Sequence, residues 1–254
     1  MTGHAPLPRH VDPHDVLAID SLLSDDERLL RDTVRQLVRD KVLPEVGDWF
    51  DRGVFPREMA KEFGSLGLLG MHLEGYGCAG TSATAYGLAC LELEAGDSGA
   101  RSFVSVQGSL AMFPIWAFGS EEQKQRWLPG MAAGDLVGCF GLTEPDSGSD
   151  PSSMRTTARQ EPGGDWVLDG TKMWITNGSI ADVAVVWART DPDGPDAGAV
   201  RGFVVPTDTP GFSAPEIHRK VSLRASVTSE LVMDGVRLPA DAVLPGVTGM
   251  RGPL

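Results

Sequence analysis

The stretch from Cys139 to Asp150 carries the residues best suited to chemistry. An apolar segment, residues 139–142, breaks there into the turn Thr143-Glu144-Pro145-Asp146-Ser147-Gly148-Ser149-Asp150. Loops at strand ends that are rich in Thr, Ser and Gly present backbone N–H groups and hydroxyls to an anion or a planar polar ring. A second segment, Met173-Trp174-Ile175-Thr176-Asn177-Gly178, follows one hairpin later. Together the two segments predict a site for a ligand with a planar polar ring or a negative charge.

The sequence gives less support for redox chemistry at cysteines, for metal binding and for acid–base catalysis. The three cysteines, Cys78, Cys90 and Cys139, have no metal-like or redox-like spacing, and they suit a reducing cytoplasm in which they pack as small apolar residues. No metal site is expected. Glu144 and Asp150 resemble a pair of catalytic acids, but we interpret them as groups that organise the loop.

Size and charge narrow the class of protein. The chain has 254 residues, of which 41% are hydrophobic, enough for a packed core in one large or two small domains. A net charge of -13 without basic clusters argues against nucleic acid and against anionic membrane surfaces as partners. No apolar run approaches the ~20 residues of a membrane span. Residues 1–10 have neither the apolar core of a secretory signal nor the arginines of a mitochondrial presequence, so a cytoplasmic location is expected.

The first half of the chain has helical signals. Residues 1–20 form an arm that contains proline and histidine, and a helical domain is predicted over residues 21–133. Ser24 with Glu27, and Ser120 with Gln123, match capping boxes that begin helices. A further helix is predicted over residues 101–118, although Gly108 and Pro114 weaken that assignment.

The second half has strand signals, and the boundary is placed near residue 134. Short segments of strand character alternate with turns rich in Gly, Pro and Asp, which predicts an antiparallel sandwich or barrel over residues 134–246. One strand is expected to enter a tight turn at residues 169–172, and residues 191–198 are expected to form a surface loop. The fold class is therefore α+β, with both candidate binding segments facing a cleft between the domains. The predicted strands are residues 136–142, 154–160, 165–169, 183–189, 202–206 and 230–238.

Both binding segments resemble the flavin-contact loops of the acyl-CoA dehydrogenases, in that order and at that separation. The resemblance extends from about residue 20 to the end of the chain. Within that family, seven short sequence motifs of this chain are most similar to those of the glutaryl-CoA dehydrogenases. They are Gly75-Tyr76-Gly77-Cys78-Ala79-Gly80, Asp97-Ser98-Gly99, Arg101-Ser102, Ser105-Val106-Gln107, Gly119-Ser120-Glu121-Glu122-Gln123, Ser222-Leu223-Arg224-Ala225-Ser226 and Leu244-Pro245-Gly246.

The resemblance implies that the chain binds FAD. It places Trp174 beside the isoalloxazine ring and Thr176 near its reactive N5 edge, whereas a tryptophan taken alone is more often a core residue. Close approach to the flavin needs small residues such as Gly141 and Gly148. The cofactor-binding residues implied are Phe140, Gly141, Leu142, Thr143, Gly148, Ser149, Trp174, Ile175 and Thr176.

The resemblance also implies a substrate. Arg101 matches an arginine that meets the distal carboxylate of glutaryl-CoA, and its planar fork suits a carboxylate. Glu94 matches an acid that pairs with this arginine, Ser102 and Ser105 add hydroxyls, and Ser149 lies near the acyl-CoA. The implied reaction is oxidation and decarboxylation of glutaryl-CoA to crotonyl-CoA, with electrons passed to an electron-transfer flavoprotein. If Arg101 is a solvated surface residue instead, the substrate is another acyl-CoA.

The chain departs from the family at its end. Members continue into a C-terminal helical bundle that carries the catalytic glutamate and the tetramer interface, and residues 247–254 correspond only to the linker that leads into it. No catalytic residue is therefore assigned within this chain, and a homotetramer is expected only for a full-length form. A non-catalytic remnant that binds acyl-CoA or a partner subunit is the alternative.

Overall fold

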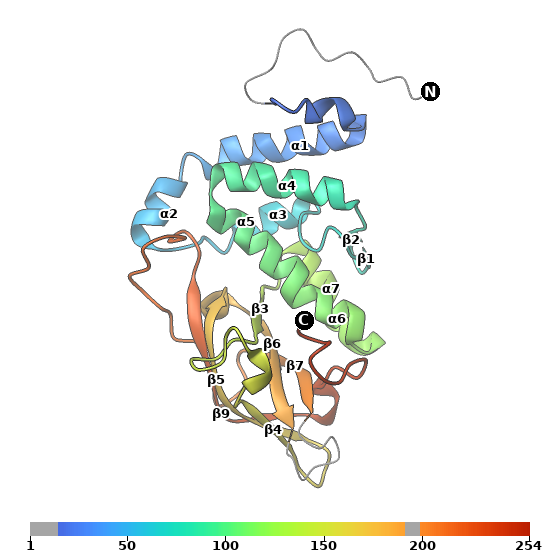
Figure 1. Cartoon of the computed structure of the whole chain (residues 1–254), viewed down its shortest axis with the longest axis vertical. Coiled ribbons are helices and arrows are strands. Elements are labelled where there is room, and N and C mark those ends of the chain that lie inside the picture. The colour runs from blue at the N-terminus through green and yellow to red at the C-terminus, as the bar shows by residue number, and fades with distance from the viewer. Residues whose placement is uncertain (1–14, 191–198) are drawn as a thin grey trace.

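The computed structural model describes residues 15–190 and 199–254. Figure 1 shows a helical lobe at one end and a β lobe at the other, with α6 and α7 at the junction. Most of the predicted arm and the predicted surface loop at 191–198 lie outside the described residues. The last helix of the first lobe ends at Ala133 and the strands of the second lobe begin at Gly138.

Local sequence signals set the helix starts. Both predicted capping boxes are confirmed: Ser24 accepts from the Glu27 N–H and Ser120 from the Gln123 N–H, and each third-position side chain bonds back to the cap. The α-helices are α1 (Asp25–Leu37), α2 (Val46–Arg52), α3 (Met59–Ser65), α4 (Ala83–Gly96), α5 (Ser98–Ser105), α6 (Phe113–Phe118) and α7 (Glu121–Ala133). Shorter helical turns are Ile19–Leu22, Pro151–Ser153, Gly178–Ile180 and Ala240–Ala242, and a small hairpin joins β1 (Glu74–Gly75) to β2 (Cys78–Ala79).

The predicted helix over residues 101–118 is confirmed as a longer, continuous rod. It runs from α5 through the π-helical turn Val106–Met112 into α6, and a similar π turn, Val38–Val42, extends α1. Gly108 is required because a Cβ there would lie 2.9 Å from the backbone nitrogen of Gly70. Pro114 stands in the first turn of α6, directly after the π-helical turn.

The prediction of a purely antiparallel sandwich is wrong, because the sheet is mixed. β3 and β4 both run parallel to β6, which pairs on its other edge with antiparallel β7. Turn signals mark where strands end but not their direction. Here β3 and β4 follow one another along the same edge of β6, and residues 142–156 loop out between them. The strands are β3 (Gly138–Gly141), β4 (Thr157–Gln160), β5 (Trp166–Thr176), β6 (Val183–Thr190), β7 (Val200–Pro206), β8 (Phe212–Ser213) and β9 (Thr228–Leu238), in the order β3-β6-β4-β5-β9-β8.

The predicted tight turn at residues 169–172 is also wrong. β5 continues through it and pairs with β9 from Trp166 to Thr176, with register shifts after Leu168 and Lys172. Gly170 has φ +145°, and a Cβ there would lie 2.6 Å from the Thr156 hydroxyl oxygen. A glycine within a strand pattern thus marks a bulge rather than a strand end.

A continuous core joins the two lobes. Val183, Val185 and Trp187 on one face of β6 pack in the same buried cluster as the helices. The alternate residues, Ala184 and Val186 among them, join a second cluster inside the β lobe. Because β6 is buried on both faces, the helical and β walls between the lobes are held in fixed relation.

Candidate functional site

A groove between the lobes brings the two predicted binding segments together. Its volume is about 230 Å³, and we call it the interlobe groove. The predicted cleft is thereby confirmed, and one wall that was not predicted comes from the π turn. The lining residues are Val106 and Leu110 from that turn, Phe140, Leu142 and Thr143 from the end of β3, and Trp174, Ile175 and Thr176 from the end of β5.

Trp174 is a surface ring at this groove and not a core tryptophan. Its side chain is 62% exposed, and its backbone lies in the left-handed region with φ +65°. This conformation costs a bulky residue about 1–3 kcal/mol and persists only where neighbouring structure enforces it. Trp174 stands within the register shift between Lys172 and Ile175, where the pairing of β5 with β9 is interrupted.

Direct hydrogen bonds join the two binding segments. The Met173 N–H donates to the Thr143 carbonyl at 2.8 Å. One residue earlier, the fully buried Lys172 ammonium donates to the Leu142 carbonyl at 3.1 Å and to Glu144 Oε1 at 2.8 Å. The segments therefore form one unit, although about 30 residues of chain separate them.

Glu144 organises its loop, as the sequence interpretation held. Its carboxylate accepts from the backbone N–H groups of Arg155 at 2.6 Å and Thr156 at 2.9 Å as well as from Lys172. Burial raises the pKa of Glu144, but these hydrogen bonds outweigh it, so the pKa lies below its ordinary value. Burial lowers the pKa of Lys172, and the contact with Glu144 opposes that shift. Asp150 likewise accepts from the Ser152 N–H at 3.1 Å.

The predicted cofactor residues divide by position. The Thr143 and Thr176 hydroxyls line the groove and form no hydrogen bond with any other described residue. Ser149 is exposed and lies outside the groove lining. Gly148 stands beside Thr143, since a Cβ there would lie 3.7 Å from the Thr143 methyl carbon. A Cβ at Gly141 would instead lie 3.2 Å from Leu231 and Lys172, inside the sheet.

Gln107 joins the helical wall to the β wall, a role that the sequence did not reveal. The side chain is fully buried in the π turn next to Val106. Its Nε2 donates to the Met131 and Leu136 carbonyls at 3.1 and 2.8 Å, and its Oε1 accepts from the Gly138 N–H at 2.7 Å. A polar residue within an apolar helical run is the signal that points to such a link.

Three of the five predicted substrate residues, Glu94, Arg101 and Ser105, form a second cluster, whereas Ser149 lies apart on its loop. Arg101 Nε donates to Glu94 Oε2 at 2.7 Å, and Arg101 Nη1 lies 3.4 Å from Ser105 Oγ. Hydrogen bonds from Ser98 and then from Arg101 lower the pKa of Glu94. The Ser105 hydroxyl also donates to the Ser102 carbonyl at 3.1 Å, whereas the Ser102 hydroxyl makes no contact with the cluster. The binding roles of all five residues stay predictions.

Several other chemistries lack the necessary groups. Among the described residues there is no cluster of three metal-ligating side chains and no helix long and apolar enough to cross a bilayer. No carboxylate lines the described part of the interlobe groove. Burial raises the pKa of the Cys139 thiol to about 12 and that of Cys78 to about 11, so neither is a nucleophilic thiolate near neutral pH.

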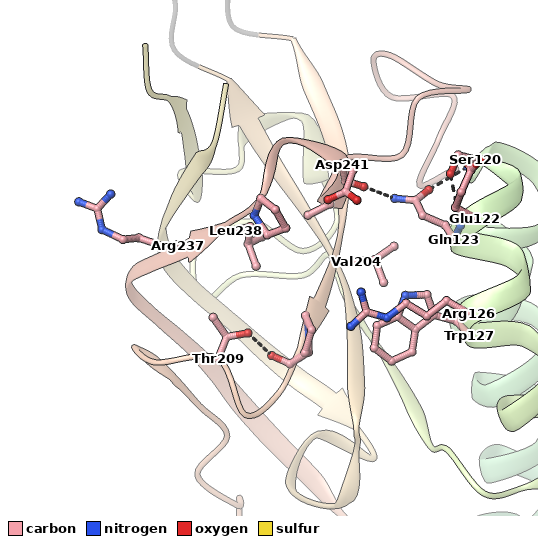
Figure 2. Close-up of a pocket in the computed structure, with 13 residues that line it drawn as sticks. Ser120, Glu122, Gln123, Arg126, Trp127, Val204, Thr209, Arg237, Leu238 and Asp241 are labelled. Carbon is pink, nitrogen blue, oxygen red and sulfur yellow. Dashed lines mark hydrogen bonds between the residues drawn. The ribbon is translucent and has the colours of Figure 1, made fainter. Parts of the chain in front are cut away.

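A larger hollow of about 450 Å³ lies elsewhere, between the start of α7, β7 and the end of β9. Figure 2 shows Arg126 and Trp127 side by side in it, with the guanidinium carbon 4.7 Å from the ring centre. Arg237 points away and forms an ion pair with Glu161. None of the predicted site residues lines this hollow.

Most of the chain is similar in sequence to known proteins. Residues 24–135 match the family model "Acyl-CoA dehydrogenase, N-terminal domain", and residues 139–236 match "Acyl-CoA dehydrogenase, middle domain". The short-chain specific acyl-CoA dehydrogenase of Homo sapiens mitochondria is 39% identical over 229 residues, which are 90% of this chain and 55% of that protein.

Two solved structures show the same fold. The glutaryl-CoA dehydrogenase of Mycobacterium smegmatis in complex with FADH2 is 65% identical with a TM-score of 0.89, over 94% of this chain and 60% of that one. A chain in the solved structure of the electron transferring flavoprotein of Acidaminococcus fermentans is 33% identical with a TM-score of 0.82, over 91% and 59%. The chain thus spans a little over half the length of these relatives.

Proposed function

Because the chain belongs to the acyl-CoA dehydrogenase family, we propose that it acts in the FAD-dependent α,β-dehydrogenation of an acyl-CoA thioester. The interlobe groove is the observation that carries the proposal. It unites apolar walls, an outward-facing tryptophan and two hydroxyls that form no hydrogen bond with another described residue in one open cavity. The M. smegmatis relative, solved with FADH2, supports the identity of the ligand.

The residues of the groove fit the ring end of a flavin. At about 230 Å³ the groove is smaller than a closed site for a whole small molecule, for which about 300–1,000 Å³ is usual. It therefore suits the isoalloxazine ring and leaves the rest of the dinucleotide outside. Phe140, Leu142 and Trp174 offer flat or apolar contact, and Thr143 and Thr176 offer hydroxyls to the polar edge.

This fit separates the role of FAD from the roles of the protein residues. When bound, FAD supplies the acceptor for the hydride that leaves the β-carbon of the acyl chain. The residues of this chain hold the ring, orient its edge and limit the access of water. Because no carboxylate lines the described groove, none of its residues is assigned as the base that removes the α-proton.

Glutaryl-CoA is the proposed substrate, with crotonyl-CoA and carbon dioxide as products. Arg101, held by Glu94 and close to Ser105, is the proposed anchor of the distal carboxylate. The 65% identity to a glutaryl-CoA dehydrogenase supports this choice. The similarity to a short-chain specific acyl-CoA dehydrogenase supports butyryl-CoA as the competing substrate.

Flavin reduction tests the proposal. A full-length form loaded with FAD is mixed with glutaryl-CoA without oxygen, and loss of flavin absorbance is expected. Arg101→Ala should raise the KM for glutaryl-CoA by about tenfold or more, because a charged hydrogen bond contributes about 1.5–3 kcal/mol, and leave the KM for butyryl-CoA unchanged. Equal effects on both substrates would contradict the dicarboxylate assignment.

The proposed partners and location complete the assignment. We propose an electron-transfer flavoprotein as acceptor, which the A. fermentans match supports, and a cytoplasmic homotetramer in a full-length form. The three free thiols are compatible with that compartment. Native mass spectrometry of a full-length form should give a tetrameric mass with FAD. An apo monomer without turnover would favour a non-catalytic role in binding acyl-CoA or a partner subunit.

A further inference from the structure

We propose that Lys172 and Glu144 are positioning residues for the interlobe groove, a buried ion pair that sets the two ligand-facing segments against one another. The identity of the ligand rests on the proposed function, but the positioning role does not. Neither side chain lines the groove, so neither is a catalytic residue.

The contacts of Glu144 fix three parts of the chain at one point. The carboxylate receives the N–H groups of Arg155 and Thr156, where the loop rejoins the sheet just before β4. It also receives the Lys172 ammonium from β5, while Glu144 itself stands at the start of the loop. One carboxylate thereby closes the loop and ties it to β5.

Lys172 provides the matching link from β5. Its ammonium reaches the Leu142 carbonyl at 3.1 Å as well as Glu144, and the side chain has no solvent exposure. The stem of Lys172 lies under Gly141, where a Cβ would come within 3.2 Å of Lys172 Cγ. A side chain at position 141 would press on this stem.

The position of the pair along the chain connects it to the groove. Thr143 precedes Glu144, and Trp174 follows Lys172 by two residues, so a shift of either charged group moves a groove wall. Trp174 is held with φ +65° immediately after this anchor. Such a conformation requires firm support from its neighbours, and the buried pair provides it on one side.

Stability alone does not account for such a pair. Removing two charges from water is costly, and apolar residues of similar volume often stabilise a protein as well or better. Apolar replacements would leave the N–H groups of residues 155 and 156 and the Leu142 carbonyl without their partners. Because those three backbone groups all belong to the 142–156 loop, the pair sets the geometry of this loop as well as contributing to stability.

Hydrogen exchange of the ligand-free chain tests the inference directly. Lys172→Met should raise amide exchange in residues 142–149 and 173–177 by about tenfold or more, since these amides lose a shared anchor. Glu144→Gln, which retains size and one acceptor, should have a smaller effect in the same residues. The double variant should not exceed Lys172→Met by much, because both substitutions remove the same link.

A matched control separates positioning from general stability. Glu92 is also buried and paired, with two hydrogen bonds from Arg35 at 2.7 and 3.0 Å, but it lies on α4 in the helical lobe. Glu92→Gln should lower the melting temperature without changing exchange in the two segments. If Lys172→Met does not fold, Glu144→Gln decides the test.

Titration with FAD adds a second readout. Lys172→Met should weaken FAD binding by about tenfold or more, as expected when a preorganised site is loosened, whereas Glu92→Gln should bind as the parent chain does. Unchanged exchange in both segments would overturn the positioning role. If the parent chain binds no FAD, the proposed function fails, and the exchange data still decide the role of the pair.

Discussion

Gln107 Oε1 accepts a hydrogen bond from the backbone N–H of Gly138 at 2.7 Å, so the helix that forms one wall of the groove is bonded directly to the strand that forms the other. The same side chain holds the Met131 and Leu136 carbonyls at the end of α7 and in the connection to β3. One fully buried amide thus fixes the junction of the two lobes.

Gln107→Leu is expected to lower the free energy of unfolding by about 2–4 kcal/mol, because three buried backbone groups lose their partner while the volume stays similar. Urea unfolding followed by tryptophan fluorescence measures the change. Gln123→Leu is the matched control, since Gln123 also bonds two backbone carbonyls between the lobes, but next to the other hollow. Both variants should be destabilised, and only Gln107→Leu should weaken FAD binding. Equal FAD affinities would contradict the role of Gln107 at the groove.

Local signals explain what the sequence predicts well. The capping boxes at Ser24 and Ser120 involve residues three positions apart, so their hydrogen bonds are readable without the fold. The two binding segments are predicted from their local sequence motifs, and the structure brings them to one groove. Cys139 packs in the second core cluster, as expected of a small apolar residue.

Non-local pairings explain what the sequence does not predict. The parallel direction of β3 and β4 depends on β6, whose pairing partners lie about 30–45 residues away. Lys172 stands in a segment read as a turn, and nothing local indicates that its ammonium is buried against Glu144. The groove wall from Val106 and Leu110 likewise exists only because the lobes pack together.

Two substitutions of Trp174 test the role of its indole ring and the role of its backbone conformation separately. Trp174→Gly should leave the free energy of unfolding within about 1 kcal/mol of the parent, because little buried surface is lost and glycine accepts φ +65°. Trp174→Val should lower it by about 1–2 kcal/mol, because a β-branched residue is poorly tolerated there. Thermal unfolding measures both values, and FAD affinity should fall equally in the two variants. A more stable valine variant would show that the left-handed backbone is not enforced.

The depressed pKa of Glu144 predicts a dependence of stability on pH. Since the folded pKa lies below the ordinary value of 4.5, the contribution of this carboxylate is complete above that value and is lost as the pH falls through the folded pKa. The melting temperatures of the parent chain and Glu144→Gln should differ most near neutral pH and converge as the pH falls from about 7 to well below 4.5. A difference that stays constant over this range would mean that the ionised carboxylate contributes nothing through its charge.

Arg101 offers a test of geometry at constant charge. Its Nε donates to Glu94, and its Nη1 lies near Ser105 Oγ. The planar guanidinium can therefore hold Glu94 and Ser105 while a terminal nitrogen binds the distal carboxylate of the substrate. A lysine has a single ammonium and cannot reproduce this arrangement. Arg101→Lys should therefore raise the KM for glutaryl-CoA by about threefold to tenfold, between the parent and Arg101→Ala, with little change in kcat. Because the side chain is 37% exposed, the melting temperature should stay nearly constant. A KM equal to that of the parent would show that only positive charge is required at this position, and a rise of the same size for butyryl-CoA would remove Arg101 from substrate selection.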